Sequence, residues 1–352
     1  GQAAIISYRV NDAHFKEFAY NKEAYNPAFA HSTSQFYVEH PEFHRVPGGR
    51  NHWNDLVHNW TIEAARQHKL DIVSELIRNY PAIDGVELDF LRHGFFFPDD
   101  TPMQQRVAVM VDFIKKVRAV LDEMEKKDGK YRYLGARVHA YNMYNLWENL
   151  GFAPKAWQDA GVDFFNLSPN YATSQQGTSI AEVRDLASEA AIYGELTHTA
   201  DTWTMVKLGY DDNHYRRLTK EMLETTARIY YARGADGVSF FNLAYYRAHG
   251  SNREKKGPFN EPLFKEMSIL ADKQALDNSP DAAYFFTRGH NAKFSANAKG
   301  TTKTYWMDMV PARGNGPATL RLLVLSEKEA THGELDAPEK VKREGWVVKI
   351  ND

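Results

Sequence analysis

Two acidic residues placed two positions apart, Glu87 and Asp89, are the first candidates for chemistry in this chain. They alternate with three apolar residues, which is the period-two pattern of a strand with two unlike faces. Helix-like segments precede and follow this strand, so we expect both of its faces to be covered. Carboxylates on a covered strand are costly unless they are paired or used. The apolar partners in the pattern are Val86, Leu88 and Phe90.

Further polar residues, followed by aromatic ones, come directly after this strand. Arg92 and His93 follow it, and a run of three phenylalanines spans residues 95–97. An acid, a guanidinium, an imidazole and aromatic rings together are what the floor and rim of a polar-substrate site require. A structural alternative stays open, in which Glu87 pairs with Arg92 or Arg9 inside a core.

Strands alternate with helices up to about residue 245, which predicts a parallel sheet built from βαβ units. Polar residues follow successive strands, as they do at the active face of a (β/α)8 barrel. No Gly-rich phosphate fingerprint follows a strand, which counts against a nucleotide-binding doubly wound sheet. The predicted strands span 3–10, 83–93, 133–140, 161–167, 191–197 and 234–242, and the predicted helices 60–79, 102–127, 154–159, 179–190, 213–233 and 261–272.

We therefore predict the α/β class, with a (β/α)8 TIM-type barrel over residues 1–275. Six strands are two short of a closed barrel, and we expect the first two to lie upstream of residue 1. After residue 275 the pattern changes to short alternating strands separated by Gly, Asn and Lys. Residues 276–352 are predicted to form a small β-sandwich accessory domain.

Composition narrows the classes of function. The chain has 352 residues and a net charge of -3, which argues against a nucleic-acid or anionic-membrane surface. No run approaches the ~20 apolar residues of a membrane span. The chain has no cysteine, which excludes disulfides, zinc–thiolate sites and thiol nucleophiles but says little about the compartment. We expect an extracytoplasmic protein without a cofactor; the oligomeric state is not predicted.

Four segments resemble those of a large bacterial group of glycosyl-hydrolase-like barrel proteins, kin to the family-10-like glycosyl hydrolases. They are SYRVNDAH, DGVELDFLRHGFFF, ARGADGVSFFNLAYY and TYWMDMVP. The resemblance implies that the first segment holds the third barrel strand and that a β-sandwich follows the barrel. It also implies carbohydrate hydrolysis, in the setting of polysaccharide degradation. It does not identify the sugar, because a fold does not fix a function.

Glycoside hydrolysis usually needs two carboxyl groups, one as acid and one as nucleophile or base. Asp89 and Glu195 end strands that should lie across the mouth of the barrel from each other. We predict them as the catalytic pair, with Glu87 as the substitute for either. The alternative for Glu195 is an ion pair with a neighbouring Arg or His that lines the barrel.

Further polar and aromatic residues near strand ends are candidates for binding the sugar. Carboxylates accept hydroxyl protons and guanidinium groups donate, whereas Asn and Asp are also common turn residues and aromatic rings are most often core. The predicted binding residues are Arg9, Asn11, Asp12, Arg92, His93, His139, Tyr141, Asn142, Asn170, Trp203, Asn242 and Tyr245.

Two rival functions remain. A metal-dependent barrel enzyme would use Asp89, Glu87, His93, His139 and Glu195 around a divalent cation, although the chain lacks an H-x-H or H-E-x-x-H ligand pair. A non-catalytic carbohydrate-binding protein would keep the aromatic residues and would not need the spaced acids. Our prediction has no metal site.

Overall fold

The computed structural model describes a large part of the chain and divides it into two compact units. The described residues are 3–10, 35–46, 57–91, 94–142, 145–169, 173–201, 215–241, 267–285, 307 and 309–310. The first unit holds residues 1–170, 177–195 and 230–239, and the second holds residues 171–176, 196–229 and 240–352.

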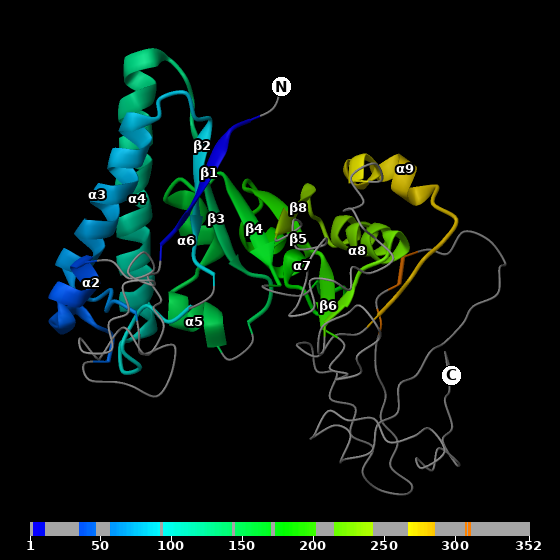
Figure 1. Ribbon diagram of the computed structural model, residues 1–352, viewed down its shortest axis with the longest axis horizontal. Helices are drawn as coiled ribbons and strands as arrows, with labels where there is room; N and C mark the ends of the chain where they lie inside the picture. Colours follow the sequence, from blue (N-terminus) through cyan, green and yellow to red (C-terminus); the bar gives the residue numbers. More distant parts are fainter. Residues whose placement is uncertain are drawn as a thin grey trace, which may run out of the picture. The chain divides into compact units, whose positions relative to one another are not determined.

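A curled six-stranded sheet is the framework of the first unit (Figure 1). The strands lie in the order β1-β2-β3-β4-β5-β8, and each neighbouring pair from β1 to β5 is parallel. This arrangement is part of a barrel wall and confirms the predicted α/β class. Its strands are β1 (Ile5–Arg9), β2 (Gly85–Asp89), β3 (Tyr133–His139), β4 (Phe164–Ser168), β5 (Ala191–Thr197) and β8 (Gly237–Phe241).

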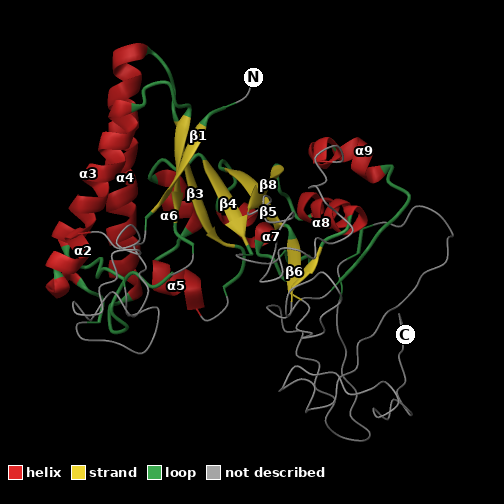
Figure 2. Cartoon of the chain, viewed as in Figure 1, coloured by secondary structure: helices red, strands yellow, loops and turns green. Residues whose placement is uncertain are grey.

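Helices connect these strands, as βαβ units require (Figure 2). In the first unit they are α2 (Gln35–Glu39), the 3-10 helix η3 (Pro41–Phe43), α3 (Glu63–Asn79), α4 (Met103–Asp128), α5 (Leu146–Leu150), α6 (Pro154–Asp159) and α7 (Ile180–Leu186). Most of α8 (Lys220–Ala232) belongs to the second unit, with η7 (Met267–Ala271), α9 (Lys273–Asp277) and the antiparallel pair β6 (Thr199–Asp201) and β7 (Tyr215–Arg217). No described helix has the length and apolar character that crossing a membrane would need.

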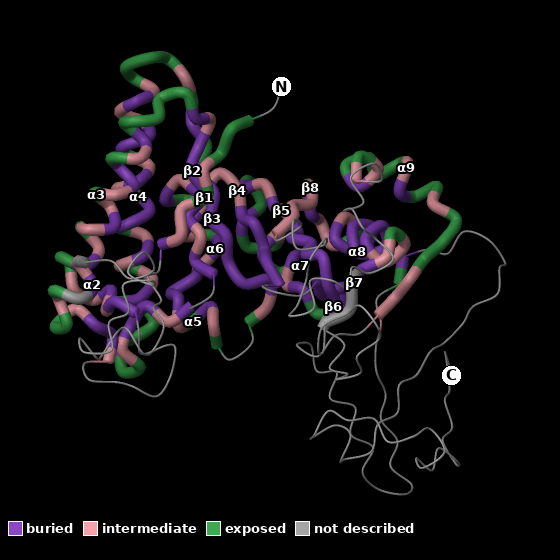
Figure 3. Tube along the Cα trace, viewed as in Figure 1, coloured by how far each residue is buried: buried purple, intermediate pink, exposed green. Residues whose placement is uncertain are grey.

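The two faces of the sheet differ in chemistry because side chains alternate along each strand. One face carries Val86, Leu88 and Leu134, all fully buried. Aromatic rings extend this face into the helical layer, where Phe90 lies 5.1 Å from the ring of Trp157 in α6. The other face carries the acidic residues, and most of the sheet is buried (Figure 3). The apolar face therefore anchors the sheet and leaves the second face for polar groups.

On the polar face, two glycines make room for aromatic rings from a neighbouring strand. A Cβ atom at Gly135 would lie 2.1 Å from Cζ of Phe164, and one at Gly237 would lie 2.6 Å from Cε1 of Tyr193. The rings of Phe164 and Tyr193 meet edge to face, with centroids 5.8 Å apart. These rings make an apolar layer toward the amino ends of the strands.

Most predicted elements of the sheet and helices are confirmed, and the differences have local causes. The helix predicted over 213–233 begins only at residue 220, because residues 215–217 pair as β7 and Thr219 Oγ1 accepts a hydrogen bond from the Met222 amide. Helices α2 and α5 and the 3-10 helix η3 were not predicted. The six residues 261–266 of the last predicted helix lie outside the described residues.

The predicted β-sandwich is not seen, and almost all of it lies outside the described residues. A strand was predicted over residues 282–286, and the described part of it, residues 282–285, forms no strand. Their backbone groups are taken by side chains: the amide of Ala283 donates to Thr225, and the amide of Phe285 donates to Gln175. The domain boundary at residue 275 and the two upstream strands stay predictions.

We expect Gly135→Ala to lower the free energy of unfolding by about 1–3 kcal/mol, because the new methyl group overlaps the ring of Phe164 and overpacking carries a cost of that size. Urea denaturation measures the change. A Gly135→Ala variant as stable as the parent would contradict the packing described.

Candidate functional site

One buried guanidinium connects two of the three predicted catalytic carboxylates. Arg137, in β3, donates from Nη1 to Asp89 Oδ2 at 2.9 Å. It also donates from Nε to Glu195 Oε2 at 2.6 Å and from Nη2 to Glu195 Oε1 at 2.8 Å. Asp89 ends the neighbouring strand β2 and stands in register with Arg137, whereas Glu195 comes from β5. The polar face thus brings the predicted pair together on one cation.

The two carboxylates are held differently. Asp89 accepts a second hydrogen bond from the Leu91 amide at 2.9 Å, and its side chain is 17% exposed. Glu195 is 2% exposed and forms a two-pronged pair with Arg137. The hydroxyl of Ser168 also donates to Glu195. Asp89 is therefore the more accessible acid, and Glu195 is the more firmly fixed one.

Burial and charge act against each other at Glu195. Burial raises the pKa of the Glu195 carboxyl, and the hydrogen bonds and charge of Arg137 oppose that rise. At Arg137, burial lowers the pKa, but Glu195 and Asp89 outweigh it and the pKa of Arg137 is raised. The guanidinium stays charged, so the cluster retains a fixed cation between two acids.

Glu87 belongs to a separate network of neutral donors. Its Oε1 accepts from the hydroxyl of Ser7 at 2.8 Å, and its Oε2 accepts from Nδ2 of Asn166 at 3.0 Å. Asn166 in turn accepts from Ser239 at 2.6 Å. The network links β1, β2, β4 and β8 and occupies both oxygens of Glu87. It favours a structural role for this residue, in place of the catalytic role that we held in reserve for it.

His139 lies on the same face at the end of β3, in register with Ser168. Burial, and then the charge of Arg137, lower the pKa of His139 to about 4, so its ring is neutral at neutral pH. Trp147 donates to the backbone carbonyl of His139 at 2.9 Å, which ties the strand end to α5.

The structure places three more predicted binding residues. Arg9 is half-buried and stands in register with Asp89. Tyr141 donates to the carbonyl of Pro169 at 3.3 Å. Asn142 accepts a hydrogen bond from the Trp147 amide, in the first turn of α5, at 3.0 Å. The remaining predicted residues, Asn11, Asp12, Arg92, His93, Asn170, Trp203, Asn242 and Tyr245, lie outside the described residues.

Sequence reasoning missed Arg137, the residue at the centre of the cluster. The signal was the spacing within its strand, because residues 135, 137 and 139 share one face. Our alternative for Glu195, an ion pair with a neighbouring Arg or His, is the contact that the structure contains. Ser168 and Asn166 were also missed as partners of the acids.

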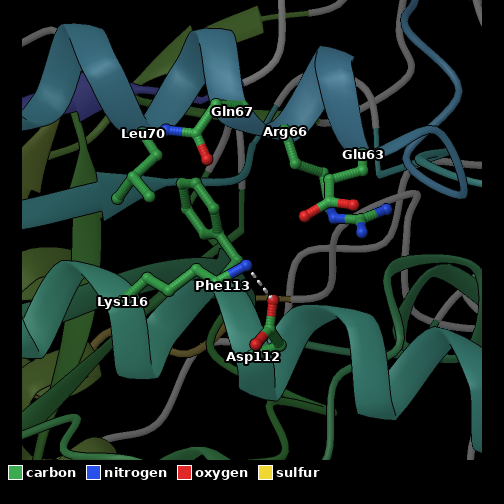
Figure 4. A pocket seen from close by; sticks show the side chains of 7 residues that line it. All are labelled: Glu63, Arg66, Gln67, Leu70, Asp112, Phe113 and Lys116. Atoms are coloured by element: carbon green, nitrogen blue, oxygen red, sulfur yellow. Dashed lines mark ion pairs between the residues drawn. The ribbon is translucent and has the colours of Figure 1, made fainter.

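A shallow groove lies away from this cluster, between α3 and α4 (Figure 4). Its lining includes Leu70 and Phe113, and Lys116 pairs with Asp112 at 2.8 Å. It contains none of the three candidate carboxylates. Within the described ranges, no group of three or more His, Asp or Glu side chains is placed to hold a metal ion. The metal-dependent alternative also needs His93, which is not described.

Neither a protein-family model nor a curated protein matches the chain. Solved structures similar to it include a glycoside hydrolase family 18 N-acetylglucosaminidase from Paenibacillus barengoltzii, at 14% identity, 53% coverage of this chain, 73% of that chain and a TM-score of 0.37. Psychrophilic chitinase B from Arthrobacter TAD20 is 12% identical, with 65% coverage of this chain, 68% of that chain and a TM-score of 0.41. The cell-surface chitinase ChiW from Paenibacillus sp. str. FPU-7 is 12% identical, with 62% coverage of this chain and a TM-score of 0.42. The match spans only 24% of the length of ChiW.

These likenesses are distant resemblances of fold to family 18 glycoside hydrolases, and not specifically to the family-10-like group that the sequence suggested. They assign no role to any residue of this chain.

Replacing Arg137 by Met should lower the free energy of unfolding by about 3–5 kcal/mol, because it leaves the carboxylate of Glu195 buried without its cation. Urea denaturation at pH 7 measures the loss. The matched control is Arg78→Met, since Arg78 pairs with Glu123 where both side chains are about half exposed, and should change stability little. Equal effects of the two substitutions would argue against a buried charge cluster.

His139 should make stability depend on pH. Its folded pKa of about 4 lies below the ordinary value of 6.5, so between these values the unfolded chain binds more protons. The free energy of unfolding should therefore fall as pH drops through this window, by about 3 kcal/mol at most. Denaturation curves of the parent and of His139→Leu test this. The variant should lose that slope, and an unchanged slope would show that other groups cause it.

Proposed function

We propose that the protein is a glycoside hydrolase that cleaves an oligo- or polysaccharide with Asp89 and Glu195. The observation that carries the proposal is that these two acids, from the non-adjacent strands β2 and β5, converge on the guanidinium of Arg137. Hydrolysis of a glycosidic bond needs two carboxyl groups with different protonation tasks. Their different surroundings suit that division.

In this proposal Asp89 is the nucleophile or base. It is the more accessible of the two carboxylates, and its two oxygens accept hydrogen bonds from Arg137 and from the Leu91 amide. A carboxylate fixed by donors on both oxygens keeps a constant orientation toward the anomeric carbon.

Glu195 is the proton donor in this proposal. Burial raises the pKa of its carboxyl, which is the shift that a general acid needs near neutral pH. The pairing with Arg137 works against protonation, so substrate binding would have to weaken at least one of the two Arg137–Glu195 hydrogen bonds. Ser168 keeps the carboxyl in place when that happens.

A second candidate function is carbohydrate binding without catalysis. One observation favours it: both oxygens of Glu195 accept hydrogen bonds from Arg137, as in a purely structural ion pair. Such a protein would use the polar face to hold sugar hydroxyls and would not transfer a proton.

Asp89→Asn and Glu195→Gln separate the two functions. On oligosaccharides from plant, marine and chitin sources, we expect each substitution to lower kcat at least about 100-fold while sugar binding persists. Glu87→Gln is the control, since it keeps an oxygen and a similar size within the Ser7–Asn166 network. Product release followed by chromatography, with binding followed by calorimetry, gives both readouts.

Full turnover in both variants would refute the assignment of Asp89 and Glu195. Binding of sugar by the parent protein without product release would favour the second candidate.

A further inference from the structure

A cluster of histidine and aromatic rings joins the connection that follows β1 to helix α3. Phe36 of α2 stacks on His68 of α3, with ring centroids 3.7 Å apart, and Tyr37 stacks on His44, with centroids 4.0 Å apart. Phe36 and Tyr37 also contact the ring of His58, with centroids 5.6 and 5.2 Å away. The histidine cluster consists of Phe36, Tyr37, His40, His44, His58 and His68.

Two histidines of the cluster are buried and stand opposite each other. His44 and His58 are 4% and 1% exposed, and they pair in an antiparallel bridge. Directly opposite residues of antiparallel strands have Cβ atoms ~4.5–5.5 Å apart, and like charges there are destabilising. Burial adds to that cost, because it disfavours the charged form of each ring. The cluster therefore suits neutral rings at these two positions.

The surroundings of His44 favour its neutral form. Burial lowers the pKa of His44, and this outweighs the opposing effects of the Tyr37 carbonyl and the charge of Glu42. The carbonyl oxygen of Tyr37 lies 2.9 Å from Nε2, and a neutral ring with its proton on Nε2 can donate to it. Below the ordinary pKa of 6.5, a released His44 binds more protons than a packed one, so the packed state loses stability as pH falls.

The charged groups of the neighbouring elements do not offset two additional positive charges. Glu39 of α2 and Glu42 of η3 are both exposed, and Glu42 is paired with His40 at 2.8 Å. Exposed acids attract a charge only weakly. Arg45, which follows η3, and Lys69 of α3 are buried and carry the same sign of charge as a protonated histidine.

The same segment holds the loop after β2. Arg45 donates from Nε to the carbonyl of Phe97 at 2.6 Å and pairs with Asp99. Its guanidinium also lies over the ring of Phe95, 5.4 Å from the centroid. Because Arg45 follows His44 directly in the chain, release of His44 would also withdraw Arg45 from this loop.

We propose that acid releases residues 35–46 from the rest of the first unit. Charging of His44 and His58 separates this segment from residues 57–58 and from α3, and the loop after β2 loosens with it. The connection that follows β1 is thus a pH-dependent conformational device. The inference goes beyond the proposed hydrolase function and does not rest on it.

Hydrogen–deuterium exchange of the parent protein at pH 7.5 and pH 5 tests the proposal. The amides of Arg45 and Asn59 are the probes, since they donate to Val57 and Phe43 across the bridge, at 2.7 Å each. Their protection factors, corrected for the intrinsic effect of pH on exchange, should fall at least about tenfold at pH 5. The Phe90 amide, inside the sheet, should stay better protected than both probes at each pH.

Two substitutions remove the buried titrating rings. His44→Gln keeps an N–H group that can donate to the carbonyl of Tyr37, and His58→Leu replaces the opposite ring by an apolar side chain. Each should reduce the loss of protection at pH 5. The double variant should lose less than about twofold between the two pH values, because neither position can then take up a proton.

Two matched controls separate the buried pair from histidine titration in general. His40→Gln changes a histidine of the same cluster whose charged ring has an anionic partner in Glu42. His139→Leu removes a buried histidine of the sheet, together with its contribution to global stability. Both controls should retain the loss of protection at Arg45 and Asn59.

Unchanged protection of the Arg45 and Asn59 amides in the parent protein at pH 5 would overturn the inference, whether or not the variants fold. Protection equal to that of the Phe90 amide would also overturn it, since the probes would then exchange through unfolding of the whole unit. A response that persists in the folded double variant would assign it to other groups, against the proposal. No sugar enters the experiment, so the hydrolase proposal stands or falls separately.

Discussion

The structure depends on the guanidinium of Arg137, which is buried and must be neutralised where it lies. Asp89 and Glu195 do this from two different strands, so a single cation fixes the distance between β2, β3 and β5 on the polar face. Removing a partner from a buried charge pair leaves an uncompensated charge, and this makes the cluster a strong constraint on the sheet. The same contact works against proton donation by Glu195, because the hydrogen bonds and charge of Arg137 oppose the rise in the Glu195 pKa that burial causes.

Side chains on the polar face form successive layers from the amino to the carboxyl ends of the strands. Each layer consists of residues that stand in register on neighbouring strands. Rings of Phe164 and Tyr193 fill the spaces above glycines toward the amino ends. The neutral network around Glu87 comes next, followed by the Arg137 cluster and then the ring of His139. The charged cluster thus lies toward the carboxyl ends of the strands, where barrel enzymes place their active sites.

The strands and most helices of the first unit were predictable because alternation and helical spacing are local patterns. The start of α8 was not, since it depends on a cap at Thr219 and on pairing by β7. The acids of the site were visible as polar residues in buried strands. Arg137 was not recognised because its partner Glu195 is 58 residues away, and no local pattern shows which strands become neighbours on the sheet.

The most direct test of the account is a crystal structure of the protein with an oligosaccharide bound. The account predicts a sugar ring at the carboxyl ends of β2, β3 and β5, in contact with Asp89, with Arg137 still joined to at least one of the two acids. A sugar bound away from these strand ends, or an Arg137 that pairs with neither Asp89 nor Glu195, would contradict it.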